Sequence, residues 1–281
     1  MTHLCLIHAN CQGEPLMDLL AAHPDFSRDF VLRHYVNYAR QPVPDADLAD
    51  CRLLLYQRLG ASWGDLASDV LLAKLPPGAE SICLPNLFFL GYWPFWYSGT
   101  PFVYPDRFLD ALLDKGLSDR EIMHIYLHTD PARYYDLEGI FHKSVAREKE
   151  KERAWDIRLT EFIQSRFRDE LLFYTFNHPG KTLCLMVAEA VLEHLGYPPL
   201  PAHVREAFPE PFAEFTLPIH PGVAASQGLL FLTTAPRFPV YGRDMDLAEY
   251  TGCYLACKRA GETDFISFLR LRAMLSGQKV P

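Results

Sequence analysis

The sequence predicts an α/β fold: a doubly wound, mainly parallel sheet of about five strands with a mainly helical insertion. Short continuous apolar runs recur along the chain, as expected for strands that are covered on both faces of a parallel sheet. Helical patterns separate these runs, and the resulting β-α-β-α order is typical of doubly wound sheets. At 281 residues the chain can form one large core, so we expect a single domain over 1–281 with an insertion at about 106–170.

The apolar runs predict strands at 4–8, 30–38, 52–57, 81–85 and 171–176. A first helix is expected over 14–22, because Pro15 lies in its first turn and Pro24 ends it. A second is expected over 181–195, where apolar residues form one stripe and Gly196 follows the last of them. Both helices would connect or cover strands of the sheet.

The segment between the fourth and fifth predicted strands is expected to be mainly helical, with helices at 109–115, 119–128 and 145–168. In the last of these, Trp155, Leu159, Phe162, Ile163 and Phe167 repeat at helical spacing. A final helix is expected over 264–275 and would pack back on the sheet.

Bulk properties exclude several functional classes. The net charge of −8 argues against a nucleic-acid partner. No apolar run approaches the roughly 18 residues that a membrane span requires, and the first eight residues lack the basic and apolar regions of a signal peptide. The seven scattered cysteines fit buried thiols in a reducing compartment, so we expect a cytoplasmic protein.

Polar residues gather where the predicted strands end. Parallel sheets bind ligands beyond the carboxyl ends of their strands. The residues that follow these ends are Asn10, Cys11, Gln12, Gly13, Gln57, Arg58, Asn86, Asn177 and His178. Four strands thus deliver polar side chains to one edge, which favours a binding or catalytic site over turns alone.

Cys11 lies between a predicted strand and the first turn of a helix. Free N–H groups at a helix N-terminus stabilise a thiolate, so we expect a lowered pKa and the most reactive of the seven thiols. The same N–H groups can hold an oxyanion or a phosphate. The alternative is a small buried residue at a tight turn.

His178 is the natural partner of Cys11, because it also lies between a strand and a helix. It would act as a general base, with Asn177 as the orienting group. Alternatively, Asn177 caps the following helix and His178 is an exposed turn residue. His220, which stands in a Pro-bounded turn, is a rival base.

Other motifs carry no function. His124 and His128 have the spacing of zinc ligands, but Ile125 stands where a zinc protease needs Glu, and we expect no metal. The glycine-rich signatures of dinucleotide sites and phosphate loops and the nucleophile elbow of serine hydrolases are all missing from the sequence.

Several blocks of the sequence resemble the WcbI family of polysaccharide-biosynthesis proteins. The most distinctive are the stretch from His8 to Leu16 and the stretch from Gly91 to Trp96. Others lie at 56–60, 84–89, 173–179 and 218–221, so the likeness extends over nearly the whole chain. Ala9 stands where that family is expected to have Gly, which affects the turn more than the chemistry.

The resemblance implies binding of coenzyme A or acetyl-coenzyme A and an O-acetyltransferase role on a capsular or surface sugar, with the family's cysteine at Cys11. An acyl donor and a carbohydrate acceptor would then be the partners. Asn10, Gln12, Gly13, Gln57 and Asn86 would line the site. Tyr92 and Trp93 would wall the slot for the pantetheine arm or pack in the core, and the cations expected near the phosphates are Arg58, Lys143 and Arg147.

Two alternatives remain from the residues. A flavodoxin-like sheet with a nucleophile after its first strand is also similar to the arrangement of hydrolases, which suggests a thiol-based esterase or deacylase. The other alternative is a non-catalytic module that binds coenzyme A or a sugar nucleotide.

Overall fold

The computed structural model of the protein describes residues 2–275. The chain forms two compact units. Among the described residues, the first comprises 2–88, 147–165 and 178–211, and the second comprises 89–146, 166–177 and 212–275. Each unit thus draws on three stretches of the chain, and the single domain with an insertion at about 106–170 stays a prediction.

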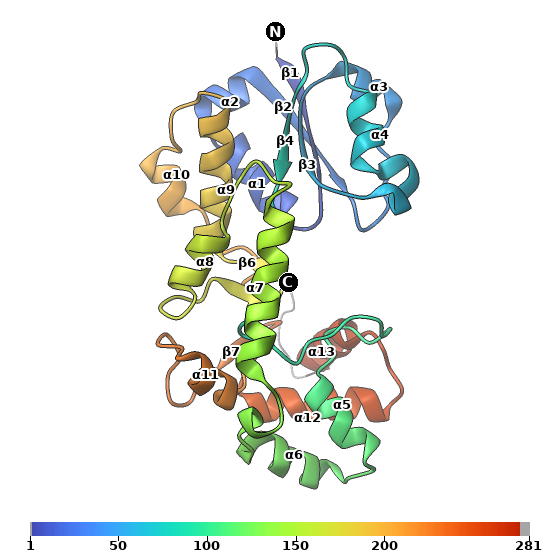
Figure 1. Ribbon diagram of the computed structural model, residues 1–281, viewed down its shortest axis with the longest axis vertical. Coiled ribbons are helices and arrows are strands. Elements are labelled where there is room, and N and C mark those ends of the chain that lie inside the picture. Colours follow the sequence, from blue (N-terminus) through green and yellow to red (C-terminus); the bar gives the residue numbers. More distant parts are fainter. Residues whose placement is uncertain (1, 276–281) are drawn as a thin grey trace. The chain divides into compact units, whose positions relative to one another are not determined.

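The first unit is built on a parallel four-stranded sheet in the order β2-β1-β3-β4 (Figure 1). Its strands are β1 (His3–Ala9), β2 (Phe30–Val36), β3 (Cys51–Gln57) and β4 (Glu80–Leu84). Apolar side chains on β1 and β3 are almost fully buried on both faces, which is why these strands read as continuous apolar runs. The α/β class with a parallel sheet is confirmed.

The sheet has four strands because the predicted fifth strand does not join it. That segment forms the three-residue β5 (Phe173–Thr175) in the second unit. Phe173 stacks on Phe89 at 5.3 Å between ring centroids. The carbonyl of Tyr174 accepts a hydrogen bond from the N–H of Leu217 at 2.8 Å, and that of Phe176 from Phe89 at 2.7 Å. Aromatic packing and these hydrogen bonds occupy the segment within the second unit.

Helices cover both faces of the sheet. On one face, α1 (Gly13–Ala21) packs against β1, β2 and α9 (Lys181–His194), and α2 (Pro24–Asp29) packs beside β2. On the other face, α3 (Asp45–Asp50) and α4 (Ser68–Ala73) bury Leu48 and Leu71 against Leu6 and Leu54. The remaining elements of this unit are the 3₁₀ helix η1 (Ala61–Leu66), β6 (His178–Pro179) and α10 (Ala202–Ala207).

The long helix predicted over 145–168 is wrong. The chain forms α7 (Leu137–Glu152) and α8 (Thr160–Arg166) with a loop between them. In that loop the N–H of Asp156 donates to the carbonyl of Cys83 at 3.0 Å, and the Asp156 carboxylate accepts from the N–H of Cys83 at 2.6 Å. The Glu152 carboxylate then accepts from the N–H groups of Leu159 and Thr160, at 2.6 and 2.7 Å, and so caps α8. These contacts with the end of β4 outweigh the helical spacing of the apolar residues.

The second unit is mainly helical with an aromatic core. Phe102, Tyr254 and Phe265 pack with ring centroids 5.0–5.5 Å apart. Besides β5 and the first part of α7, its elements are α5 (Arg107–Asp114), α6 (Asp119–His128), η2 (Pro131–Arg133), α11 (Pro221–Gln227), α12 (Leu247–Arg259), α13 (Phe265–Leu275) and an antiparallel pair, β7 (Phe238–Val240) with β8 (Arg243–Met245).

Across residues 2–275, every helix is too short or too polar to span a lipid bilayer.

Candidate functional site

The strand order places one crevice at the carboxyl end of the sheet. The chain passes from β1 to β2 on one side and then crosses to β3 on the other, so the direction of winding reverses between β1 and β3. In open α/β sheets, ligands bind beyond the carboxyl ends of the strands at such a reversal. Asn10, Cys11 and Gln12 follow β1 directly, and Gln57 is the last residue of β3.

The buried carboxamide of Gln57 joins the ends of all four strands at this crevice. Its Oε1 accepts from the N–H of Asn10 at 2.9 Å and from Nδ2 of Asn37 at 3.3 Å. Its Nε2 lies 3.1 Å from the carbonyl of Pro85 and 3.3 Å from the side-chain oxygens of Asn10 and Gln12. Gln57 is 1% exposed, and its hydrogen bonds hold the ends of the strands together.

Asn10 and Gln12 complete the network. The N–H of Gln12 donates to Oδ1 of Asn10 at 2.9 Å, and Nδ2 of Asn10 donates to Oδ1 of Asn86 at 3.3 Å. The Gln12 carboxamide pairs with both backbone groups of Leu87, donating to its carbonyl at 2.8 Å and accepting from its N–H at 3.1 Å. The side chains predicted to meet at the strand ends of β1, β3 and β4 do meet, and they fix the turn that carries Cys11.

The sequence analysis missed Asn37, which is 3% exposed and belongs to the same network. It follows β2, and its N–H donates to the carbonyl of Ala9 at 3.0 Å. The predicted second strand ran to residue 38 and therefore hid Asn37 inside it. The signal that would have identified Asn37 is a carboxamide after an apolar strand, the same signal that identified Asn10 and Asn86.

Cys11 is the one partly exposed cysteine, since the other six are buried. The prediction of a lowered pKa is wrong: burial raises the pKa of Cys11 to about 11, and the nearby Glu14 carboxylate adds to the rise. The backbone N–H groups of Cys11 and Gln12 act in the opposite direction but do not outweigh desolvation. The thiol is therefore protonated near neutral pH.

A small cavity lies beside the turn. Gln12, Gly13 and Gln57 line it together with Pro179 and Cys184 from the segment that opens α9. Its volume of about 20 Å³ has room for a single water molecule. Gly13 is required by packing, because a Cβ atom there would lie 2.4 Å from Nε2 of His34.

His178 precedes Pro179, so its backbone adjoins the cavity wall. Burial lowers the pKa of His178 to about 4, so the imidazole is neutral at pH 7. Asn177 does not cap the following helix, because the N-cap of α9 is Gly180. Its Oδ1 instead accepts a hydrogen bond from the hydroxyl of Thr175 at 3.0 Å.

His220 has a structural role in the second unit, which argues against it as the base. Its Nε2 lies 2.7 Å from the carbonyl of Tyr126, and its Nδ1 accepts from the N–H of Gly222 at 3.0 Å to cap α11. The ring is 4% exposed, and burial lowers its pKa. Both ring nitrogens are occupied, so neither is free to take a proton from a substrate.

Tyr92 and Trp93 belong to the core of the second unit rather than to a slot. The hydroxyl of Tyr92 lies 2.7 Å from the carbonyl of Phe167, and Nε1 of Trp93 donates to the carbonyl of Leu217 at 2.9 Å. Both rings are almost fully buried. Their polar atoms are satisfied internally, as buried aromatic side chains require.

The three predicted phosphate ligands are surface residues. Arg58 lies after β3, and its Nη2 is 3.6 Å from the Asp69 carboxylate. Lys143 and Arg147 are exposed on α7. Of the three, Arg58 follows directly on a residue of the carboxamide network.

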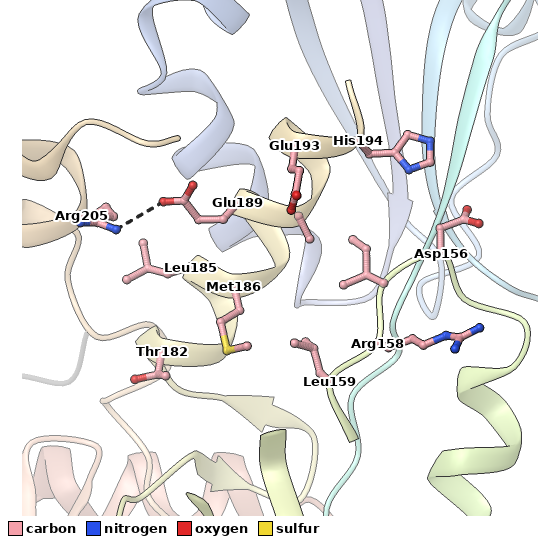
Figure 2. Close-up of a pocket in the computed structure, with 12 residues that line it drawn as sticks. Asp156, Arg158, Leu159, Thr182, Leu185, Met186, Glu189, Glu193, His194 and Arg205 are labelled. Atoms are coloured by element: carbon pink, nitrogen blue, oxygen red, sulfur yellow. Dashed lines mark ion pairs between the residues drawn. The ribbon is translucent and has the colours of Figure 1, made fainter. Parts of the chain in front are cut away.

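A larger groove of about 740 Å³ lies along the outer face of α9 (Figure 2). Leu185, Met186 and Leu159 form its apolar floor, and Arg205 faces Glu189 across one end at 3.8 Å. The opposite stripe of α9, with Cys184 and Val187, lines the small cavity beside Gln12. The helix therefore separates this groove from the Cys11 turn.

The topology and the strand-end network define a doubly wound α/β protein with its candidate site at the switch point of the sheet. Within that class, the chain belongs to the WcbI family of polysaccharide biosynthesis enzymes, whose model matches residues 4–200. Among curated proteins, none matches the sequence significantly.

A solved structure of WcbI, described as a novel polysaccharide biosynthesis enzyme, has a similar fold. The TM-score is 0.76 at 19% sequence identity, and the match covers 98% of this chain and 96% of the other. That structure is described as the native protein without a disulfide bond between coenzyme A and one of its cysteines.

Proposed function

We propose that this protein is a coenzyme A-binding O-acyltransferase that moves an acetyl or similar acyl group from coenzyme A to a sugar hydroxyl in surface polysaccharide biosynthesis. The observation that carries the proposal is the Cys11 turn, a partly exposed cysteine held by a buried carboxamide network at the switch point of the sheet. Family membership supports a role in polysaccharide biosynthesis. The description of coenzyme A and a cysteine in the WcbI structure supports the ligand.

The turn offers groups suited to thioester chemistry. The backbone N–H groups of Cys11 and Gln12 both act to lower the pKa of the Cys11 thiol. The N–H of Gln12 is engaged by Oδ1 of Asn10, so the N–H of Cys11 is the amide proposed to stabilise the developing oxyanion. In the reaction, a base takes the proton of the sugar hydroxyl while its oxygen forms a bond to the thioester carbonyl carbon. The tetrahedral intermediate then expels the sulfur of coenzyme A, which receives the proton. His178, neutral at pH 7, is the proposed base.

The raised pKa of Cys11 favours this route over a thiol-based esterase. A thiol nucleophile attacks as the thiolate, and with a pKa of about 11 only about one thiol in ten thousand is ionised at pH 7. Direct attack by the sugar hydroxyl needs no thiolate. We therefore propose that Cys11 lines the thioester site.

Calorimetric titration with coenzyme A, acetyl-coenzyme A and free sugar tests the binding step. We expect both coenzyme A ligands to bind and to raise the melting temperature by mass action on the folded state. Transfer is then measured as free coenzyme A released from acetyl-coenzyme A, quantified by mass spectrometry with and without a saccharide acceptor. Absence of a thermal shift at millimolar coenzyme A, with the protein folded, would refute the proposal.

A further inference from the structure

A half-buried ion pair lies next to the candidate site and has no part in the proposed chemistry. Lys151 is in the last turn of α7, and its Nζ donates to the carbonyl of Asn86 at 3.0 Å and to Oε2 of Glu148 at 2.6 Å. The two side chains are 31% and 11% exposed. The ammonium group also lies 5.9 Å from the ring centroid of Phe88 and 5.4 Å from that of Trp155.

Such a pair is a costly way to stabilise a fold. Burial lowers the pKa of Lys151 and raises that of Glu148, so each charged form is disfavoured by desolvation. The attraction between buried ions often does no more than offset that desolvation, and apolar residues of similar size can serve equally well. The geometry of Lys151 therefore calls for an explanation other than global stability.

The contacts of Lys151 lead to the Cys11 turn. The segment from Pro85 to Leu87 is held at three successive residues: Gln57 binds the carbonyl of Pro85, Lys151 binds that of Asn86, and Gln12 binds both backbone groups of Leu87.

Asn86 also accepts a hydrogen bond from the side chain of Asn10 through its Oδ1. The carboxamide of Asn10 in turn fixes the N–H of Gln12. Lys151 is the charged member of this chain of contacts, and hydrogen bonds to charged groups are the stronger ones.

We propose that Lys151, held by Glu148, is a positioning residue that anchors the 85–87 segment and thereby sets the geometry of the Cys11 turn for coenzyme A. Its structural part, the anchoring, stands independently of the ligand. Its functional part rests on the proposed function. Lys151 acts through Asn86 and Asn10 and contacts neither the thiol nor the reacting atoms.

Hydrogen exchange of the intact protein tests the anchoring without any ligand. We expect Lys151→Ala to speed amide exchange in peptides that cover 84–90 and 10–13 by about tenfold, the loss of one charge-assisted hydrogen bond. Peptides from the middle of α9 should be unchanged. Lys149→Ala is the matched control, because Lys149 is exposed on the same turn of helix. If Lys151→Ala does not fold, Glu148→Gln should show the same local effect more weakly.

Coenzyme A affinity tests the functional part. Lys151→Ala should weaken binding by about tenfold, and added propylamine should restore both the affinity and the slow exchange by returning an ammonium group to the vacated space. Unchanged exchange at 84–90, or faster exchange throughout the first unit without rescue, would overturn the anchoring. If wild-type protein binds no coenzyme A, the proposed function fails while the exchange data still decide the anchoring.

Discussion

The carboxamide of Gln57 is predicted to be the principal support of the candidate site. Gln57→Leu keeps the approximate size of the side chain but removes the five hydrogen bonds of the carboxamide, among them those to the N–H of Asn10, the Nδ2 of Asn37 and the carbonyl of Pro85. A buried polar group that loses its partner costs about 1–3 kcal/mol. Since neighbouring effects are not additive, we expect a total loss of about 2–5 kcal/mol.

Urea unfolding at 25 °C measures this loss in the free energy of unfolding. The expected loss is smaller than or comparable to the free energy of unfolding of folded domains, which is typically about 5–15 kcal/mol. Gln164→Leu is the control, since Gln164 is only partly buried on α8. It should shift the free energy of unfolding by no more than about 0.5 kcal/mol. A Gln57→Leu protein within that same margin of wild type would show that the network does not support the fold. Coenzyme A affinity should fall together with stability if the network also shapes the ligand site.

Three further predictions concern the thiol and the histidines. Brief alkylation, mapped by mass spectrometry, should label Cys11 before the six buried cysteines. The rate of labelling should be low at pH 7 and should rise about tenfold per pH unit up to the pKa of about 11. A rate that levels off by pH 9 would contradict the effect of burial on this pKa. His178→Ala should reduce turnover by about 10²–10⁴-fold with little change in coenzyme A affinity. His220→Ala should instead lower the free energy of unfolding by about 1–2 kcal/mol, because the helix cap is lost. The opposite pattern in kinetics and unfolding would exchange the two roles. His8 is fully buried and its pKa is lowered to about 4, so the stability that it contributes as a neutral ring is present above pH 6.5 and is lost as the pH falls toward 4. His8→Phe should reduce the slope of that part of the stability profile measured by urea unfolding, to which His178 also contributes. An unchanged slope would argue against a buried neutral ring at position 8.

The strands of the sheet could be predicted because their signal is local. β1 and β3 lie within a residue of the predicted ranges, since a strand buried on both faces is a continuous apolar run. The strand ends also placed Asn10, Gln57 and Asn86 together correctly, because carboxyl ends of parallel strands share one edge.

Where a local pattern competed with a distant partner, the prediction failed. Apolar residues at helical spacing continue past Glu152, yet the chain breaks there because Asp156 pairs with Cys83, 73 residues away in the sequence. Likewise, 171–176 has the composition of a strand, but aromatic packing in the second unit holds it outside the sheet.

The sequence by itself determined the α/β class, the turn that carries Cys11, and the strand-end carboxamides, since each depends on residues close together in the chain. Only the tertiary structure decided the pKa of Cys11, the internal roles of His220, Tyr92 and Trp93, and the anchoring contact of Lys151. The physical reason is that desolvation and hydrogen-bond satisfaction depend on which atoms surround a group in space. For Asn86 and Lys151 those neighbours are 65 residues apart in the sequence.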